Sequence, residues 1–211
     1  MTERVEILLN QLKSRSYRNE RMKLPKYVMG DTFDINNIAP YMRDAIKFEK
    51  PVLFDKDRIG FNRTTDSLIK GCEGNVTPDY YKVISVGFDE LLNQLEENKP
   101  KFTDKYNLDF AKAVKDCVNI VYEISDSYRE YAKEHNCTEL YNALCNIPRK
   151  GAKDFYEAIV FLKLSLYSLR CCMNYHLTLG RFDQYMYPFY LQSKRHGVSD
   201  EEIFELIEEF F

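Results

Sequence analysis

One segment restricts the fold of this 211-residue chain more than any other. From Asp154 to Met173, apolar residues recur at three- and four-residue spacing, and further apolar residues stand beside that stripe. The stripe comprises Phe155, Ile159, Leu162, Leu166 and Leu169, and its flanks add Val160, Phe161 and Leu164. A helix that is apolar nearly all round is buried on most of its circumference. The pattern therefore predicts a helix that other elements surround.

This helix is not expected to cross a membrane. Its longest apolar run, Ala158 to Leu169, is interrupted by Lys163 and Ser165 and is shorter than a bilayer requires. The opening residues, Met1 to Arg4, include an acid and lead into no apolar stretch, which argues against a signal peptide. Six cysteines without any C-x-x-C spacing indicate reduced thiols. We therefore expect a cytoplasmic protein with no membrane partner.

Five further segments have helical patterns, and one has the pattern of strands. The helical segments run from Thr2 to Leu12, Asp34 to Phe48, Thr77 to Glu97, Asn107 to Ala132 and Ser199 to Phe211. Thr77-Pro78 is a typical helix start, because Thr can cap the first turn and Pro is tolerated at its first position. Pro51 to Phe61 predicts two short strands around a turn. No Pro-, Gly- or Ser-rich linker intervenes, so we expect residues 1–211 to form a single, mainly α unit.

The charges of the chain are nearly balanced. Its 33 acidic and 30 basic residues give a formal net charge of −3. Such a balance provides no long-range attraction to nucleic acid, which we therefore do not expect as a partner. The sequence stops on Phe210 and Phe211 without a capping residue, whereas chain ends are usually polar, so we expect truncation at the C-terminus.

The segment from Thr178 to Tyr190 combines a helix break with a polar cluster. Gly180 interrupts the pattern, and Arg181, Asp183 and Gln184 follow it among aromatic residues. Unpaired charge inside a core costs several kcal/mol, so buried groups of this kind must pair with each other or face a cavity. Taken alone, the residues favour a structural ion pair over a site, because such networks are the more common of the two.

The same segment resembles the glycyl radical enzymes of the pyruvate formate-lyase family. Their pattern of a small hydroxyl residue, Leu-Gly-Arg-x-Asp-Gln-Tyr and an aromatic-Pro-aromatic tail stands at residues 178–190. Three further segments fall in the family's order, namely Pro51 to Asn62, Asn75 to Val83, and Ile147-Pro148 with Asp154 to Ala158. The resemblance implies the N-terminal helical portion of a ten-stranded α/β barrel, with a small β-hairpin and no complete barrel.

The resemblance also implies what this chain does not carry. In the family, a glycyl radical near the C-terminus oxidises a cysteine, whose thiyl radical abstracts hydrogen from substrate inside the closed barrel. A separate S-adenosylmethionine-dependent 4Fe-4S activating enzyme installs the radical. We expect neither the Cys-x-Glu triplet of the dehydratases nor an Arg-x-x-Gly-Tyr loop here. We therefore expect no catalytic residue, no metal ligand and no bound cofactor. The neighbours Cys171 and Cys172 are expected only to pack in a helix.

Three residues are carried over from the family as substrate-binding candidates. Asp183 matches the family's Asp after Gly-Arg-x, which contacts substrate in the hydroxyproline-acting branch, and Thr178 matches a substrate-bonding Ser. Asn75 matches a His of the glycerol and hydroxyproline dehydratases and an Asp of the choline lyase. Because Asn cannot donate a proton as protonated His can, those substrates are disfavoured. His176 is a further candidate, although a lone His is more often a core residue.

The leading functional prediction is a substrate-pocket portion of a radical lyase or dehydratase that cleaves a C–O, C–N or C–C bond of a small metabolite. Such a portion is inactive alone. Its expected partners are the substrate, the activating enzyme acting through the missing C-terminal part, and a second copy or a complementary C-terminal half. The alternative is a non-catalytic helical protein, derived from the family, that binds a partner or a small molecule.

Overall fold

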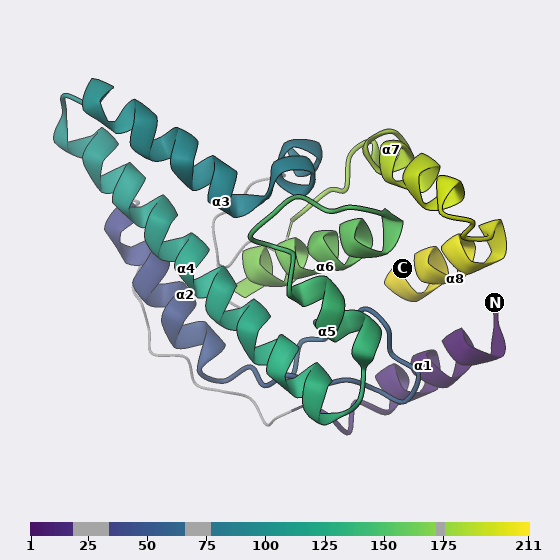
Figure 1. Cartoon of the computed structure of the whole chain (residues 1–211). Helices are drawn as coiled ribbons and strands as arrows, with labels where there is room; N and C mark the ends of the chain where they lie inside the picture. Colours follow the sequence, from purple (N-terminus) through teal and green to yellow (C-terminus); the bar gives the residue numbers. More distant parts are fainter. Residues whose placement is uncertain (19–33, 66–76, 172–175) are drawn as a thin grey trace.

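The computed structural model describes residues 1–18, 34–65, 77–171 and 176–211. Within these residues the chain is mainly helical and contains no β-strand, which confirms the predicted class (Figure 1). The helices are α1 (Glu3–Ser14), η1 (Ile35–Asn37), α2 (Ile38–Ile46), α3 (Tyr80–Asn98), η2 (Lys99–Lys101), α4 (Lys105–Glu134), α5 (Thr138–Leu144), α6 (Phe155–Cys171), α7 (Phe182–Arg195) and α8 (Asp200–Phe210). Asn75 lies outside the described residues.

Helix α6 is the surrounded helix that the apolar pattern predicts. It contacts α2, α3, α4, α5, α7 and α8, and lies in the middle of the view in Figure 1. Ile159, Phe161, Leu162 and Leu164 have no exposed surface. Each such side chain contributes on the order of 1.5–3 kcal/mol by leaving water. The core of the described residues is therefore built around this one helix.

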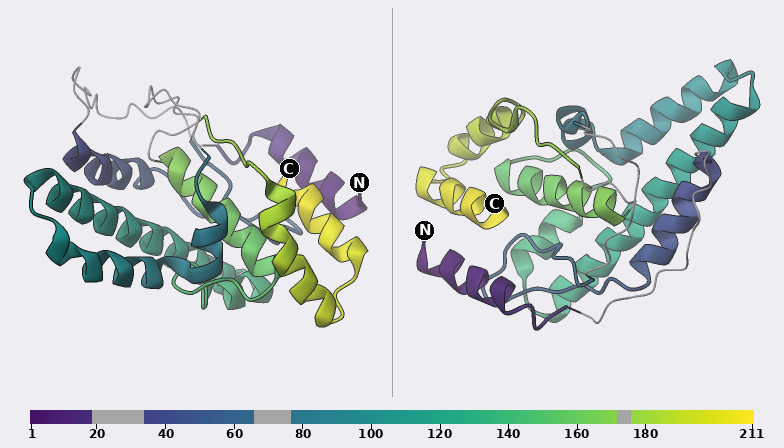
Figure 2. Two further views of the ribbon diagram at one scale, coloured as in Figure 1. Left: turned by 90° about the horizontal axis from the view of Figure 1, so that it is seen from above. Right: turned by 180° about the vertical axis from the view of Figure 1, so that it is seen from behind.

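Helices α3 and α4 form an antiparallel pair that extends away from α6 (Figures 1 and 2). With 30 residues, α4 is about 45 Å long, so only part of it can pack on the core. Its second half is buried at residues such as Val121 and Tyr128. Phe110, near the start of α4, is 46% exposed because it lies on the extended part of the pair.

Helix α3 is broken in its interior at Gly87, where the segment from Pro148 to Lys150 crosses it. Gly87 has φ 80° and ψ 168°, a backbone conformation that side-chain-bearing residues rarely adopt. The freed amides donate elsewhere, from Phe88 to the carbonyl of Pro148 and from Asp89 to that of Arg149, both at 2.9 Å. A Cβ at position 87 would stand 2.4 Å from the carbonyl carbon of Lys150. Glycine is thus required where the two segments cross.

The cap of α3 differs from the prediction. Asp79, not Thr77, caps the helix, and its side chain accepts a hydrogen bond from the amide of Lys82 at 3.1 Å. A carboxylate at this position also interacts favourably with the helix dipole, which explains its preference over the hydroxyl two residues earlier.

The predicted hairpin at Pro51 to Phe61 is not formed, since these described residues adopt turns without strand pairing. Two carboxylates take the amides that a strand ladder would need. Asp57 accepts from the amides of Phe54, Ile59 and Gly60 at 3.4, 3.1 and 2.7 Å. Glu209 of α8 accepts from Arg58 and Ile59 at 2.8 and 3.0 Å. Side-chain acceptors therefore replace the β-pairing that the alternating sequence predicted.

Helices α1 and α8 pack together, so the two ends of the chain lie close to each other (Figures 1 and 2). Arg4 of α1 pairs with Glu205, whose carboxylate lies 3.1 Å from its Nε, and with the buried Glu209. Ser199 caps α8 by accepting a hydrogen bond from the amide of Glu202 at 3.0 Å.

Candidate functional site

Gly180 positions the segment from His176 to Asp183 at the start of α7. Its φ of 62° turns the chain into the helix, and a Cβ added there would lie 2.7 Å from Cγ2 of Thr77. The start of α7 is therefore held closely against the residues that precede α3.

Thr178 and Thr77 are joined by a hydrogen bond between their hydroxyl groups. This contact links two segments separated by 101 positions, both of which carried the family resemblance. Asn75 precedes Thr77 by two residues, so it belongs to the same region of the sequence. Thr178 and His176 are both exposed. The structure thus brings together two of the segments from which the candidate pocket was predicted.

Asp183 lies in the first turn of α7, where the helix dipole favours a carboxylate. Arg181, Asp183 and Gln184 are all exposed, so the premise of a buried polar cluster is wrong. The helix buries its other face through Met186, Phe189 and Ser193. Among the described residues, Asp183 and Arg181 form no ion pair with each other. The closed pair that composition alone favoured is therefore not found.

Asp183 borders a shallow, mainly apolar hollow of about 450 Å³ between α7 and α8. Tyr187 and Phe204 line it and are 55% and 60% exposed. Thr178 is not among the lining residues, so Asp183 and Thr178 do not share this hollow. Their assignment to one substrate pocket stays a prediction.

The chain does contain one Cys-x-Glu triplet, Cys137-Thr138-Glu139, so the prediction that none is present is wrong. Glu139 is held by Arg58, with Nε and Nη2 2.8 and 2.6 Å from its two carboxylate oxygens. Burial raises the pKa of the Cys137 thiol, which disfavours the reactive thiolate. A carboxylate committed to an arginine beside a protonated thiol favours a structural role for the triplet.

Cys171 packs in the core as predicted. It has no exposed surface, and burial is the main cause that raises its pKa to about 12. Cys172 lies outside the described residues. Within the residues that the structure covers, no group of three or more His, Cys, Asp or Glu side chains could hold a metal ion. No helix in the described ranges combines the length and apolarity that crossing a bilayer requires.

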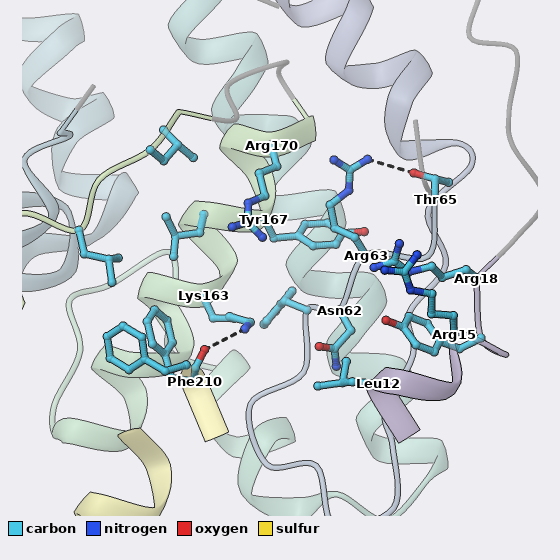
Figure 3. Close-up of a pocket in the computed structure, with 16 residues that line it drawn as sticks. Leu12, Arg15, Arg18, Asn62, Arg63, Thr65, Lys163, Tyr167, Arg170 and Phe210 are labelled. Carbon is cyan, nitrogen blue, oxygen red and sulfur yellow. Dashed lines mark hydrogen bonds between the residues drawn. The ribbon is translucent and has the colours of Figure 1, made fainter. Parts of the chain in front are cut away.

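Sequence reasoning missed a second hollow, of about 790 Å³, that opens beside α6 (Figure 3). Its cationic side chains are Arg15, Arg18, Arg63, Lys163 and Arg170, and none of the described residues that line it is acidic. One signal was readable in the sequence. Lys163 and Arg170 stand seven residues apart, on one face of an otherwise apolar helix.

Solved structures with the same fold were found. At 22% identity, 83% of this chain matches 23% of the glycerol-bound B12-independent glycerol dehydratase from Clostridium butyricum, with a TM-score of 0.56. A structure described as 1,2-propanediol dehydration in Roseburia inulinivorans matches 82% of this chain and 23% of its own length. The identity is 22% and the TM-score is 0.60. A glycyl radical enzyme from Archaeoglobus fulgidus is 20% identical over 82% of this chain and 23% of its own length, with a TM-score of 0.50. No curated protein sequence matches significantly.

These neighbours are glycyl radical enzymes, so the helical unit has the fold of one part of such an enzyme. The chain belongs to the pyruvate formate lyase-like family, whose sequence pattern matches residues 62–211. It spans 23% of the length of the solved structures that it matches.

Proposed function

We propose that this chain forms the N-terminal, substrate-contacting portion of a glycyl radical lyase or dehydratase that cleaves a C–O, C–N or C–C bond of a small metabolite. The hydroxyl contact between Thr77 and Thr178 is the main support, because it joins the two candidate segments directly. Asp183 begins the next helix, in an exposed position that a further part of the enzyme can cover.

In this proposal the residues have separate roles. The Thr178 hydroxyl exchanges a hydrogen bond with a substrate hydroxyl or amine group, and the Asp183 carboxylate accepts one from such a group. Asn75 orients substrate through its amide and donates no proton to a leaving group. His176, exposed next to Thr178, is the fourth wall residue.

The radical chemistry belongs to residues outside this chain in the same proposal. The sequence contains no Arg-x-x-Gly-Tyr loop, and its one Cys-x-Glu triplet is held in an ion pair. In the complete cytoplasmic enzyme, the glycyl radical that the activating enzyme installs would generate the thiyl radical that abstracts hydrogen from substrate. The portion described here acts with a complementary C-terminal part or as half of a homodimer.

Two measurements test the proposal. The purified 211-residue chain, incubated anaerobically with a glycyl radical activating enzyme, should show neither lyase activity nor a glycyl-type EPR doublet. In an enzyme that contains this segment, Asp183→Ala should lower kcat/KM about 5- to 150-fold, which corresponds to about 1–3 kcal/mol for a lost substrate hydrogen bond.

The glycyl radical EPR intensity of that variant should equal the parent's, because Asp183 lies in a substrate wall rather than in the radical path. Glu201→Ala, which removes an exposed carboxylate from α8, is the matched control and should leave kcat/KM unchanged. Unchanged kcat/KM in Asp183→Ala would show that this residue does not contact substrate. An EPR doublet on the chain alone would refute the proposal that the radical residues lie outside it.

A further inference from the structure

The cationic hollow is built from three separate parts of the chain. Arg15 and Arg18 follow α1, Arg63 comes from the segment after α2, and Lys163 and Arg170 come from α6 (Figure 3). Like charges that line one space repel each other, so an anion bound among them is stabilised.

Lys163 is held in place by Phe210. Its Nζ donates to the carbonyl oxygen of Phe210 at 3.3 Å and lies 5.2 Å from the centre of that ring (Figure 3). Burial is the main cause that lowers the pKa of Lys163, and the charge of Arg170 lowers it further. The buried acids Asp57 and Glu209 act in the opposite direction, but backbone amides already bind both of them.

Arg63 is held in a fixed orientation. Its Nε donates to Glu49 at 2.8 Å, and its Nη2 donates to the hydroxyl of Thr65 at 3.0 Å. Glu49 is itself buried and also accepts from the amide of Thr64 at 2.7 Å. Glu49 thus orients the guanidinium and compensates one charge of the set. A preoriented guanidinium is suited to bind a carboxylate or a phosphate group.

Apart from Asn62 and Thr65, the other lining residues are apolar or aromatic. Phe61, Leu166, Leu177, Leu179 and Phe210 line the hollow beside the cations, with Tyr17 and Tyr167 adding rings. A bare inorganic anion would leave this surface in contact with water, whereas an anion with an apolar body would cover it.

From this arrangement we infer that the hollow binds a small organic oxyanion, with its carboxylate or phosphate between Arg63, Lys163 and Arg170 and its apolar body against the leucines and Phe61. Binding requires only residues of this chain and does not depend on the proposed lyase function. The two kinds of head group share the same chemistry, and the experiment distinguishes between them.

Isothermal titration calorimetry of the purified chain at low ionic strength tests the inference with four probes. Hexanoate and hexyl phosphate carry both an oxyanion and an alkyl body, hexanol carries only the body, and inorganic phosphate only the head. We expect saturable one-to-one binding of at least one of the two alkyl anions, and at least tenfold weaker binding of hexanol and inorganic phosphate. Whichever alkyl anion binds more tightly identifies the head group.

Arg170→Gln is the informative variant, because Arg170 is exposed and its loss leaves the core intact. We expect it to weaken binding of the preferred alkyl anion at least fivefold, whereas Arg195→Gln on exposed α7 surface should change it less than twofold. Lys163→Met should weaken binding as well, with folding checked by circular dichroism.

Three results would each overturn the inference. Equal affinity for hexanol and the alkyl anions would show that the charged head group does not contribute to binding. Equal losses in Arg170→Gln and Arg195→Gln would mean nonspecific attraction. An acidic Glu-rich peptide that binds at least tenfold more tightly than either alkyl anion would identify a protein segment, rather than a small molecule, as the ligand.

Discussion

At the scale of single residues, the carboxyl group of Asp57 determines how one loop is held and how the fold responds to pH. It is buried and accepts hydrogen bonds from three backbone amides. It accepts a fourth from Nδ2 of Asn62 at 2.9 Å. Glu209 binds the adjacent amides of the same loop. Burial, followed by the charge of Glu209, raises the pKa of Asp57 to about 7. One dry site therefore disfavours two simultaneous negative charges.

This shift predicts that the chain becomes less stable as the pH rises. The native pKa of Asp57 is higher than the unfolded value of 3.8, so between these values the native state holds more protons than the unfolded state. Its contribution is fully present below about pH 4 and is lost as the pH rises through about 7. Burial also raises the pKa of Glu157, in the same direction. Urea denaturation at pH 5, 6, 7 and 8 should give a falling midpoint.

Glu209→Gln should flatten that dependence, because it removes the charge beside Asp57 while its amide oxygen can still accept from the loop. Glu201→Gln, on the exposed face of the same helix, should leave the slope as it is in the parent. A midpoint that rises from pH 5 to pH 8 in the parent chain would contradict the assignment.

Some properties of these single residues could not be predicted from the sequence. The polarity of Thr178 and Asp183 was readable, but their exposure was not, because it depends on which face of α7 packs against the core. Lys163 was noted only as a break in an apolar run. Its place in a cationic hollow depends on Arg63, a hundred positions away, and on the segment after α1.

At the scale of elements, the interior break of α3 allows a direct test. Gly87→Ala adds a Cβ at a φ of 80° and places it within 2.6 Å of the backbone of Lys150. The unfavourable φ and the close contact together should reduce the free energy of unfolding by about 2–4 kcal/mol. Urea denaturation measures this loss.

Gly197→Ala is the matched control, since its φ is 83° and nothing lies within 4 Å of the new Cβ. It should lose only about 1–2 kcal/mol, from backbone strain alone. Equal losses in the two variants would show that the crossing at Lys150 adds no constraint.

Helices were predictable because apolar spacing is local, and the segments expected at residues 107–132 and 154–173 match α4 and α6 closely. The hairpin at Pro51 to Phe61 was not predictable as a loop, because its alternation is typical of strands. One of the two carboxylates that bind its amides, Glu209, lies about 150 positions away. A local pattern cannot indicate such a partner.

At the scale of the whole molecule, the described residues leave an aromatic face exposed on α7 and α8. Tyr187 and Phe204 are more than half exposed there, and Phe211, which follows the last residue of α8, is 77% exposed. The family relatives are far longer than this chain, which spans 23% of their length. An exposed apolar patch of this kind is typical of a surface that contacts protein.

We therefore predict that the isolated chain self-associates through this face. Sedimentation velocity over a 50-fold concentration range should show reversible growth in mass. Phe204→Glu should suppress this growth, because a charge would have to be buried in the contact. Its free energy of unfolding should stay within about 0.5 kcal/mol of the parent's, since the side chain is 60% exposed. Tyr106→Glu, 65% exposed on the extended α3–α4 pair, should leave association unchanged. A parent chain that stays monomeric over the whole concentration range would contradict self-association through this face.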